Sequence, residues 1–268
     1  LLQHDNSHAS TTTPSTKRKT FGYAGKCVKI LVVIPCILYC FLLLLLRFSP
    51  TFRQQLVFLN YVNNPFYKYD DPQAYGLLSA TNFYINGNAG KLGVWYIPAL
   101  GSKAINDGKP VILYMHGNAH SRATRHRTGM YKVLSALGCH VVAHDYRGYG
   151  DSDGIPTEQG LTEDSLSVFQ WILANNNNGP VFLWGHSLGS AVAITVSKIL
   201  TETNVSVMAI ILEAPFNNMR EAAFNHPLAM PYRILPFFQA TLQEINKMFK
   251  SDQTISSVKY DILILHDH

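Results

Sequence analysis

Residues 181–190 read Val-Phe-Leu-Trp-Gly-His-Ser-Leu-Gly-Ser. The apolar run at 181–184 predicts a buried strand, and the small and apolar residues at 188–200 predict a buried helix. Gly185 and Gly189 stand two residues before and after Ser187, the spacing of a nucleophile elbow, in which a strained strand-to-helix turn presents a serine hydroxyl. Ser187 is therefore predicted to be a catalytic nucleophile. The alternative is a tight β-α turn without chemistry, because a G-x-S-x-G pattern also arises by chance.

The segments around this turn alternate between strand and helix patterns. Residues 77–85 and 92–97 are typical of antiparallel strands joined by the turn residues at 86–90. Further strands are predicted at 111–115, 140–143, 207–212 and 262–265, and helices at 128–137 and 161–174. This alternation indicates an α/β fold with a mostly parallel sheet, right-handed crossovers and a site at the carboxyl ends of the strands.

The chain has 268 residues, of which 47% are hydrophobic and 15% charged. This composition suits one globular domain with an appendage. We expect a disordered tail at residues 1–27, a transmembrane anchor at 28–48, a linker at 49–74 and the globular domain at 75–268. The apolar run 30–46 would be roughly 25 Å long as a helix, and its flanks extend it toward the thickness of the hydrocarbon core. A cleaved signal peptide is the alternative, although its apolar region would be shorter and followed by small residues.

Charge around the apolar run predicts its orientation. Five basic residues precede the run, whereas Arg47 and Arg53 are the basic residues that follow closely. The positive-inside rule then places the N-terminus in the cytoplasm and the globular domain on the luminal or external side. Asn204 begins an Asn-Val-Ser glycosylation sequon that would be usable on that side.

The net charge of +5 resides in the N-terminal segment. Of the 22 basic and 17 acidic residues, six basic residues and Asp5 precede residue 48, which leaves 16 of each sign beyond it. A neutral domain makes nucleic acid an unexpected partner. Cys139 is the cysteine of the domain, so no internal disulfide framework is expected, and the cysteines do not have metal-site spacing with histidines. We predict no cofactor and no metal.

A second motif follows the predicted strand at 111–115, where the chain reads His116-Gly117-Asn118-Ala119. In hydrolases with a nucleophile elbow, the corresponding loop supplies one oxyanion-hole amide and the residue after the nucleophile supplies the other. We therefore expect the N–H groups of Asn118 and Leu188 to bind the oxyanion. His116 and His186 are interpreted as structural residues. In the turn at 145–152, Arg147 is expected to form a local ion pair with Asp145 or Asp151.

Four motifs occur in an order and spacing that resemble one known family. They are His-Gly-Asn-Ala at 116–119, Asp-Tyr-Arg-Gly-Tyr-Gly-Asp-Ser at 145–152, Trp-Gly-His-Ser-Leu-Gly at 184–189 and Ile-Leu-Glu-Ala-Pro-Phe at 211–216. Together they resemble the membrane-anchored α/β-hydrolase domain-containing lipases that act on lysophosphatidylserine and monoacylglycerol. The resemblance implies an α/β-hydrolase fold, an endoplasmic reticulum membrane protein with a luminal domain, and monoacyl lipid esters as substrates. Two alternatives are a related depalmitoylating thioesterase and a catalytically silent hydrolase fold that binds lipid or protein.

The resemblance also implies features of the C-terminal part. Such folds insert a cap between strands, here at about 216–255, and the apolar residues in it suit either an acyl-chain pocket or ordinary core packing. Those apolar residues are Phe224, Leu228, Met230, Pro231, Tyr232, Ile234, Leu235, Pro236, Phe237 and Phe238. Family members carry the catalytic acid just after the strand that corresponds to 261–265, and the histidine base further on. We expect both beyond His268 and expect residues 1–268 alone to be inactive, with Glu213 as the alternative acid.

Overall fold

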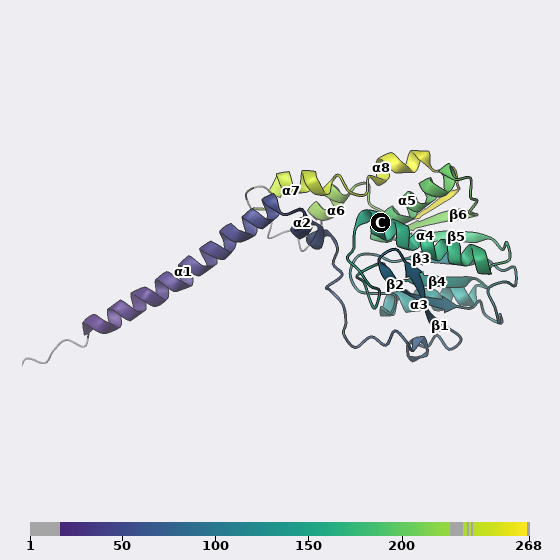
Figure 1. The fold of residues 1–268 in the computed structure, drawn as a ribbon, viewed down its shortest axis with the longest axis horizontal. Coiled ribbons are helices and arrows are strands. Elements are labelled where there is room, and N and C mark those ends of the chain that lie inside the picture. Colours follow the sequence, from purple (N-terminus) through teal and green to yellow (C-terminus); the bar gives the residue numbers. More distant parts are fainter. Residues whose placement is uncertain (1–16, 226–232, 235, 237, 267–268) are drawn as a thin grey trace, which may run out of the picture.

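The computed structural model describes residues 17–225, 233–234, 236 and 238–266. Within these residues the centre of the fold is a seven-stranded sheet in the order β1-β2-β4-β3-β5-β6-β7 (Figure 1). The strands are β1 (Thr81–Gly87), β2 (Gly90–Ile97), β3 (Val111–Met115), β4 (His140–His144), β5 (Val181–His186), β6 (Ala209–Glu213) and β7 (Ile262–Leu265). The pairs β1-β2 and β2-β4 are antiparallel and the other neighbours are parallel. The predicted mostly parallel sheet is confirmed.

Most predicted strands and helices match closely, and the N-terminal hairpin differs in its strand bounds and in the length of its turn. β1 begins at Thr81 rather than at residue 77, because Leu77 and Ala80 close a turn in which the Ala80 N–H donates to the Leu77 carbonyl at 3.0 Å. Gly87 pairs directly with Gly90, so the hairpin turn is only two residues long. Gly90 has a φ of 118°, which glycine adopts at little cost.

Helices cover both faces of the sheet, because both faces carry apolar side chains. Along β3, Val111 and Leu113 pack into one hydrophobic cluster, and Ile112 and Tyr114 pack into the other. Successive side chains of a strand point to opposite faces, so a strand that is apolar throughout requires a cover on each side. The covering helices are α3 (Arg125–Ala136) on one face and α4 (Glu158–Asn175) and α5 (Leu188–Glu202) on the other.

The N-terminal part consists of helices attached at one end of the globular body. α1 (Lys17–Phe48) projects away from the sheet (Figure 1), α2 (Pro50–Val57) lies within the predicted linker, and η1 (Pro72–Tyr75) lies at the linker's end. Ser49 separates α1 from α2 and caps α2, since its hydroxyl accepts from the Phe52 N–H at 3.1 Å. Phe58, directly after α2, is fully buried in the main hydrophobic cluster.

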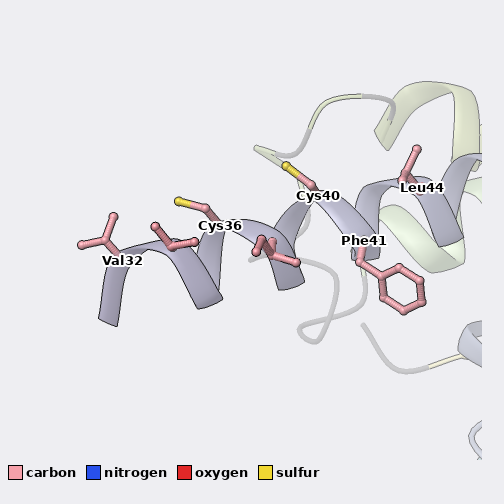
Figure 2. A pocket seen from close by; sticks show the side chains of 7 residues that line it. Val32, Cys36, Cys40, Phe41 and Leu44 are labelled. Atoms are coloured by element: carbon pink, nitrogen blue, oxygen red, sulfur yellow. The ribbon is translucent and has the colours of Figure 1, made fainter. Parts of the chain in front are cut away.

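The surface of α1 is apolar over several turns. Figure 2 shows Cys36, Cys40 and Leu44 following one another along this helix, four residues apart. A shallow apolar groove on α1 is lined by Val32, Val33, Cys36, Ile37, Cys40, Phe41 and Leu44. Over the part of the chain that the structure describes, no helix combines the length and the apolarity that crossing a membrane requires. The predicted span at 28–48 is therefore not confirmed, and the first sixteen residues of the predicted tail lie outside the described residues.

Between β6 and β7 the described chain is helical. It contains α6 (Met219–Asn225), α7 (Phe238–Ile245), α8 (Ser251–Thr254) and η3 (Ile255–Ser257), and α7 packs against both α1 and α2. Of the apolar residues expected to line a cap, Leu228, Met230, Pro231, Tyr232, Leu235 and Phe237 lie outside the described residues. β7 forms one edge of the sheet, opposite β1, and its Leu263 and Ile264 are 54% and 55% exposed.

Candidate active site

Ser187 lies in a strained turn between β5 and α5. Its φ of 50° and ψ of −113° are unusual for a residue other than glycine. Such conformations cost about 1–3 kcal/mol and persist where the surroundings hold them. Here the Ser187 N–H donates to the Glu213 carbonyl at 2.9 Å, and the Ser187 carbonyl accepts from the Ser190 hydroxyl at 2.6 Å. The structure therefore has the sharp strand-to-helix turn that the motif predicts.

The two glycines of the motif allow strand and helix to approach closely. A Cβ on Gly185 would lie 2.3 Å from the Gly189 carbonyl oxygen, and a Cβ on Gly189 would lie 2.0 Å from the Met115 carbonyl oxygen. Neither contact is sterically possible, and both involve backbone atoms that cannot rotate away. Because Met115 ends β3, this close packing also brings the start of α5 against the loop that follows β3.

The loop after β3 is anchored by the side chain of Asn118. Its Oδ1 accepts from the N–H groups of Leu59 and Ala119 at 2.9 and 3.1 Å and from the Tyr149 hydroxyl at 2.7 Å, and its Nδ2 donates to the Val57 carbonyl. The backbone N–H groups of Asn118 and Leu188 donate no hydrogen bond to any described residue. Leu188 is the first residue of α5, where amides lack an intrahelical partner. Both predicted oxyanion donors are thus available for a ligand.

His116 is a buried structural residue, as the sequence predicts. Its side chain is fully buried and packs against Tyr146 and Tyr149. Its Nδ1 donates to the Gly117 carbonyl at 2.8 Å, and its Nε2 lies 3.2 Å from Asp145 Oδ1. Burial and the neighbouring Arg127 lower the pKa of His116, which favours a neutral ring that carries its proton on Nδ1.

The predicted ion pair of Arg147 with Asp145 or Asp151 is wrong. Arg147 instead pairs with Asp164 at 2.7 Å and with Glu163 at 3.0 Å. Both acceptors are on α4, and Asp164 also accepts from the Arg147 N–H at 2.7 Å. The guanidinium therefore ties the 145–152 turn to the helix that covers it, rather than closing the turn on itself.

The aspartates of that turn bind Arg122, a residue that the sequence analysis did not single out. Arg122 Nη1 lies 2.5 Å from Asp145 and 2.6 Å from Asp151. Burial alone would raise the pKa of Asp145, but the Arg122 guanidinium beside it lowers that pKa to about 2. Arg122 lies between β3 and α3 in the chain, so the ion pairs join loops that follow neighbouring strands.

Glu213 and His186 lie beside the elbow, and neither side chain hydrogen-bonds the Ser187 hydroxyl. Glu213 ends β6, and its Oε2 accepts from Trp184 Nε1 at 2.8 Å. The His186 ring packs against His126 at 6.0 Å between centroids, and burial lowers the pKa of His186. Among the residues with described positions, no histidine hydrogen-bonds the Ser187 hydroxyl. Asp267 and His268 fall outside those residues.

Comparison with known proteins agrees with this geometry. Residues 106–268 match the hydrolase family model described as "Serine aminopeptidase, S33". The fold is similar to that of an alpha-beta hydrolase from Vibrio vulnificus, with a TM-score of 0.68 and 20% identity over 82% of this chain and 77% of that one. An esterase of Pyrococcus furiosus, PF2001, has a TM-score of 0.52 at 17% identity over 69% and 68% of the two chains. The chain belongs to the serine hydrolases of the α/β-hydrolase fold.

Within this class its sequence relatives are more specific. It is 37% identical over 271 residues to lysophosphatidylserine lipase ABHD12 of Bos taurus, covering 93% of this chain and 68% of that protein. The Danio rerio protein of the same name is 39% identical over 248 residues, or 85% and 65% of the two chains. Protein ABHD12B of Homo sapiens is 39% identical over 229 residues, or 79% and 63%. The chain belongs to the ABHD12 family and spans about two thirds of the length of these relatives.

Proposed function

We propose that this protein is a lipase that cleaves the ester bond of monoacyl lipids, with lysophosphatidylserine as its substrate and monoacylglycerol as a second one. The observation that carries the proposal is the strained Ser187 elbow, in which the Leu188 N–H directly after the serine has no partner among the described residues and Gly189 packs against the end of β3, where the loop with Asn118 begins. The names of the relatives support a lysophospholipid as the acyl donor.

The reaction follows from these groups. Ser187 Oγ attacks the ester carbonyl, its proton passes to a base, and the developing oxyanion is bound by the N–H groups of Asn118 and Leu188. Collapse expels the headgroup alcohol and leaves an acyl-enzyme, which water then hydrolyses to a fatty acid. Among the described residues, none is assigned as this base or as its carboxylate partner.

We propose further that α1 anchors the protein in the endoplasmic reticulum membrane with its N-terminus in the cytoplasm and its catalytic domain in the lumen. Support comes from the exposure of its large apolar side chains, such as Leu31 and Ile37 at 72% and 61%. In addition, α7, which lies between β6 and β7 in the chain, packs against α1 and α2. A lipid substrate would then reach Ser187 from the membrane surface.

The test is active-site labelling of the full-length protein in isolated membranes. A fluorophosphonate probe should label the wild type and not the Ser187→Ala variant, and lysophosphatidylserine hydrolysis should disappear with the labelling. Ser197→Ala is the matched control, because Ser197 lies on the same helix and its hydroxyl only donates to the Ala193 carbonyl. Undiminished labelling of Ser187→Ala would contradict the assignment of the nucleophile. Faster cleavage of a palmitoyl thioester than of either lipid would favour a depalmitoylase instead.

A further inference from the structure

The peptide unit between Gly117 and Asn118 is held by its carbonyl oxygen. This oxygen accepts from Arg127 Nη2 at 3.1 Å and from His116 Nδ1 at 2.8 Å. The same peptide unit carries the Asn118 N–H, which is the proposed oxyanion donor. A peptide group is planar and trans, so its carbonyl and its N–H point in opposite directions. Two donors on the oxygen therefore set the direction in which the N–H points.

Arg127 is built to hold this loop. Besides the Gly117 carbonyl, it donates to the carbonyls of Ala119 at 3.0 Å and Ser121 at 2.8 Å. Its side chain is almost fully buried, and it makes no ion pair with a described carboxylate. Arg127 lies in the first turn of α3, so a rigid element positions the guanidinium. Because these partners of Arg127 are carbonyl oxygens of the loop after β3, its positive charge polarises the peptide groups of that loop.

The clamped peptide unit lies beside the nucleophile. A Cβ on Gly117 would lie 3.2 Å from the carbonyl oxygen of His186, the residue before Ser187. The side chain of Asn118 is fixed by its own hydrogen bonds to Val57 at the end of α2, to Leu59 just after it and to Tyr149. The Asn118 N–H is thus the polar group of this unit that has no partner among the described residues.

We propose that Arg127 is a positioning residue of the oxyanion hole, which acts by holding and polarising the Gly117–Asn118 peptide so that its N–H is directed at the developing oxyanion. This inference rests on the proposed function. A donor aligned before the reaction need not reorganise when charge develops, and a cation on the far side of the peptide strengthens the N–H as a donor. In this proposal the Arg127 guanidinium binds the negative, carbonyl end of the peptide dipole, and the positive, N–H end of the same dipole binds the oxyanion.

The alternative is that Arg127 only stabilises the loop, and steady-state kinetics distinguish the two roles. Removing a residue that only stabilises the loop lowers the melting temperature. Removing a positioning residue also weakens the binding of the transition state and so lowers kcat. For Arg127→Met in the full-length protein, we expect kcat to fall about 10²-fold, near the lower end of the loss for removing an oxyanion donor, with KM changed less than about threefold. Affinity for a trifluoromethyl ketone analogue, whose hemiketal oxyanion occupies the hole, should fall by the same factor as kcat. The pH dependence of kcat should keep its midpoint, since the base is unchanged.

Arg147→Met is the matched control, because it also removes a guanidinium that ties a loop to a helix. It should lower the melting temperature and leave kcat and inhibitor affinity near the wild-type values. If Arg127→Met does not fold, Arg127→Lys supplies the same comparison, with kcat and inhibitor affinity expected to fall together about tenfold. A folded variant of Arg127 with wild-type kcat, or with kcat lowered and inhibitor affinity unchanged, would overturn the inference. A wild-type protein that hydrolyses no ester would contradict the proposed function and this inference with it.

Discussion

At the scale of single residues, buried charges join the loops around the nucleophile. Arg122, Asp145 and His116 have almost no exposed side-chain surface, and Asp151 is partly exposed. A buried ion pair contributes little net stability, but removing one partner leaves an uncompensated charge that is costly. Asp145 and Asp151 both pair with Arg122 but differ in burial, so substituting each in turn tests how burial affects the stability that the pair contributes.

Asp145→Asn should destabilise the protein by about 3–5 kcal/mol, because it leaves the Arg122 guanidinium buried without its main partner. Asp151→Asn should cost less, since water screens the exposed side of that pair. Urea unfolding monitored by tryptophan fluorescence measures both. Equal losses for the two variants would show that burial does not set the strength of these pairs.

Asp145 also gives the protein a dependence on acid. Its pKa is lowered from 3.8 to about 2 on folding, so the stabilisation is fully present above pH 4 and is lost as the pH falls from about 4 to 2. Wild-type stability should therefore drop across this interval by about 2 kcal/mol more than that of Asp145→Asn. Unfolding curves for the two proteins at pH 5, 4, 3 and 2 test this. Parallel declines would mean that other carboxylates carry the acid sensitivity.

At the scale of elements, the distance between β3 and the start of α5 determines the shape of the elbow. Gly189→Ala should prevent folding or cost several kcal/mol, since its Cβ would overlap the Met115 carbonyl oxygen. Gly129→Ala is the opposite case, because Gly129 lies inside α3 and its Cβ would meet no atom within 4 Å. Alanine there should stabilise the protein by about 0.5–1 kcal/mol. Thermal melting of both variants is the measurement, and a tolerated Gly189→Ala would contradict the proposed strand-helix packing.

At the scale of the whole molecule, the proposed topology places the domain in the lumen. Asn204 is exposed in the loop after α5, so an oligosaccharyltransferase could reach it. Translated with microsomes, the full-length protein should carry a glycan that an endoglycosidase removes, and Asn204→Gln should lack that mobility shift. An unglycosylated protein whose domain is digested by protease from the cytosolic side would reverse the topology.

The features readable from the sequence are local ones. The strands at 111–115 and 262–265 have the predicted bounds, and the turn at Ser187 has the predicted strain, because periodicity and glycine spacing act over a few residues. The strand order, with β4 between β2 and β3, was left open, since it depends on which apolar faces meet in space.

The electrostatic partners of the site depend on the tertiary structure alone. Arg147 reaches α4 rather than the aspartates in its own turn, and those aspartates bind Arg122 from a loop more than twenty residues earlier. Arg127 carries no motif that marks it, yet it contacts three carbonyls of the proposed oxyanion loop. Long flexible side chains select their partners from whatever the packed elements bring within reach, and this selection has no sequence period. Glycine spacing therefore predicted the strained turn at Ser187, while the packing of α3 and α4 on the sheet decided which charged residues pair in the loops around it.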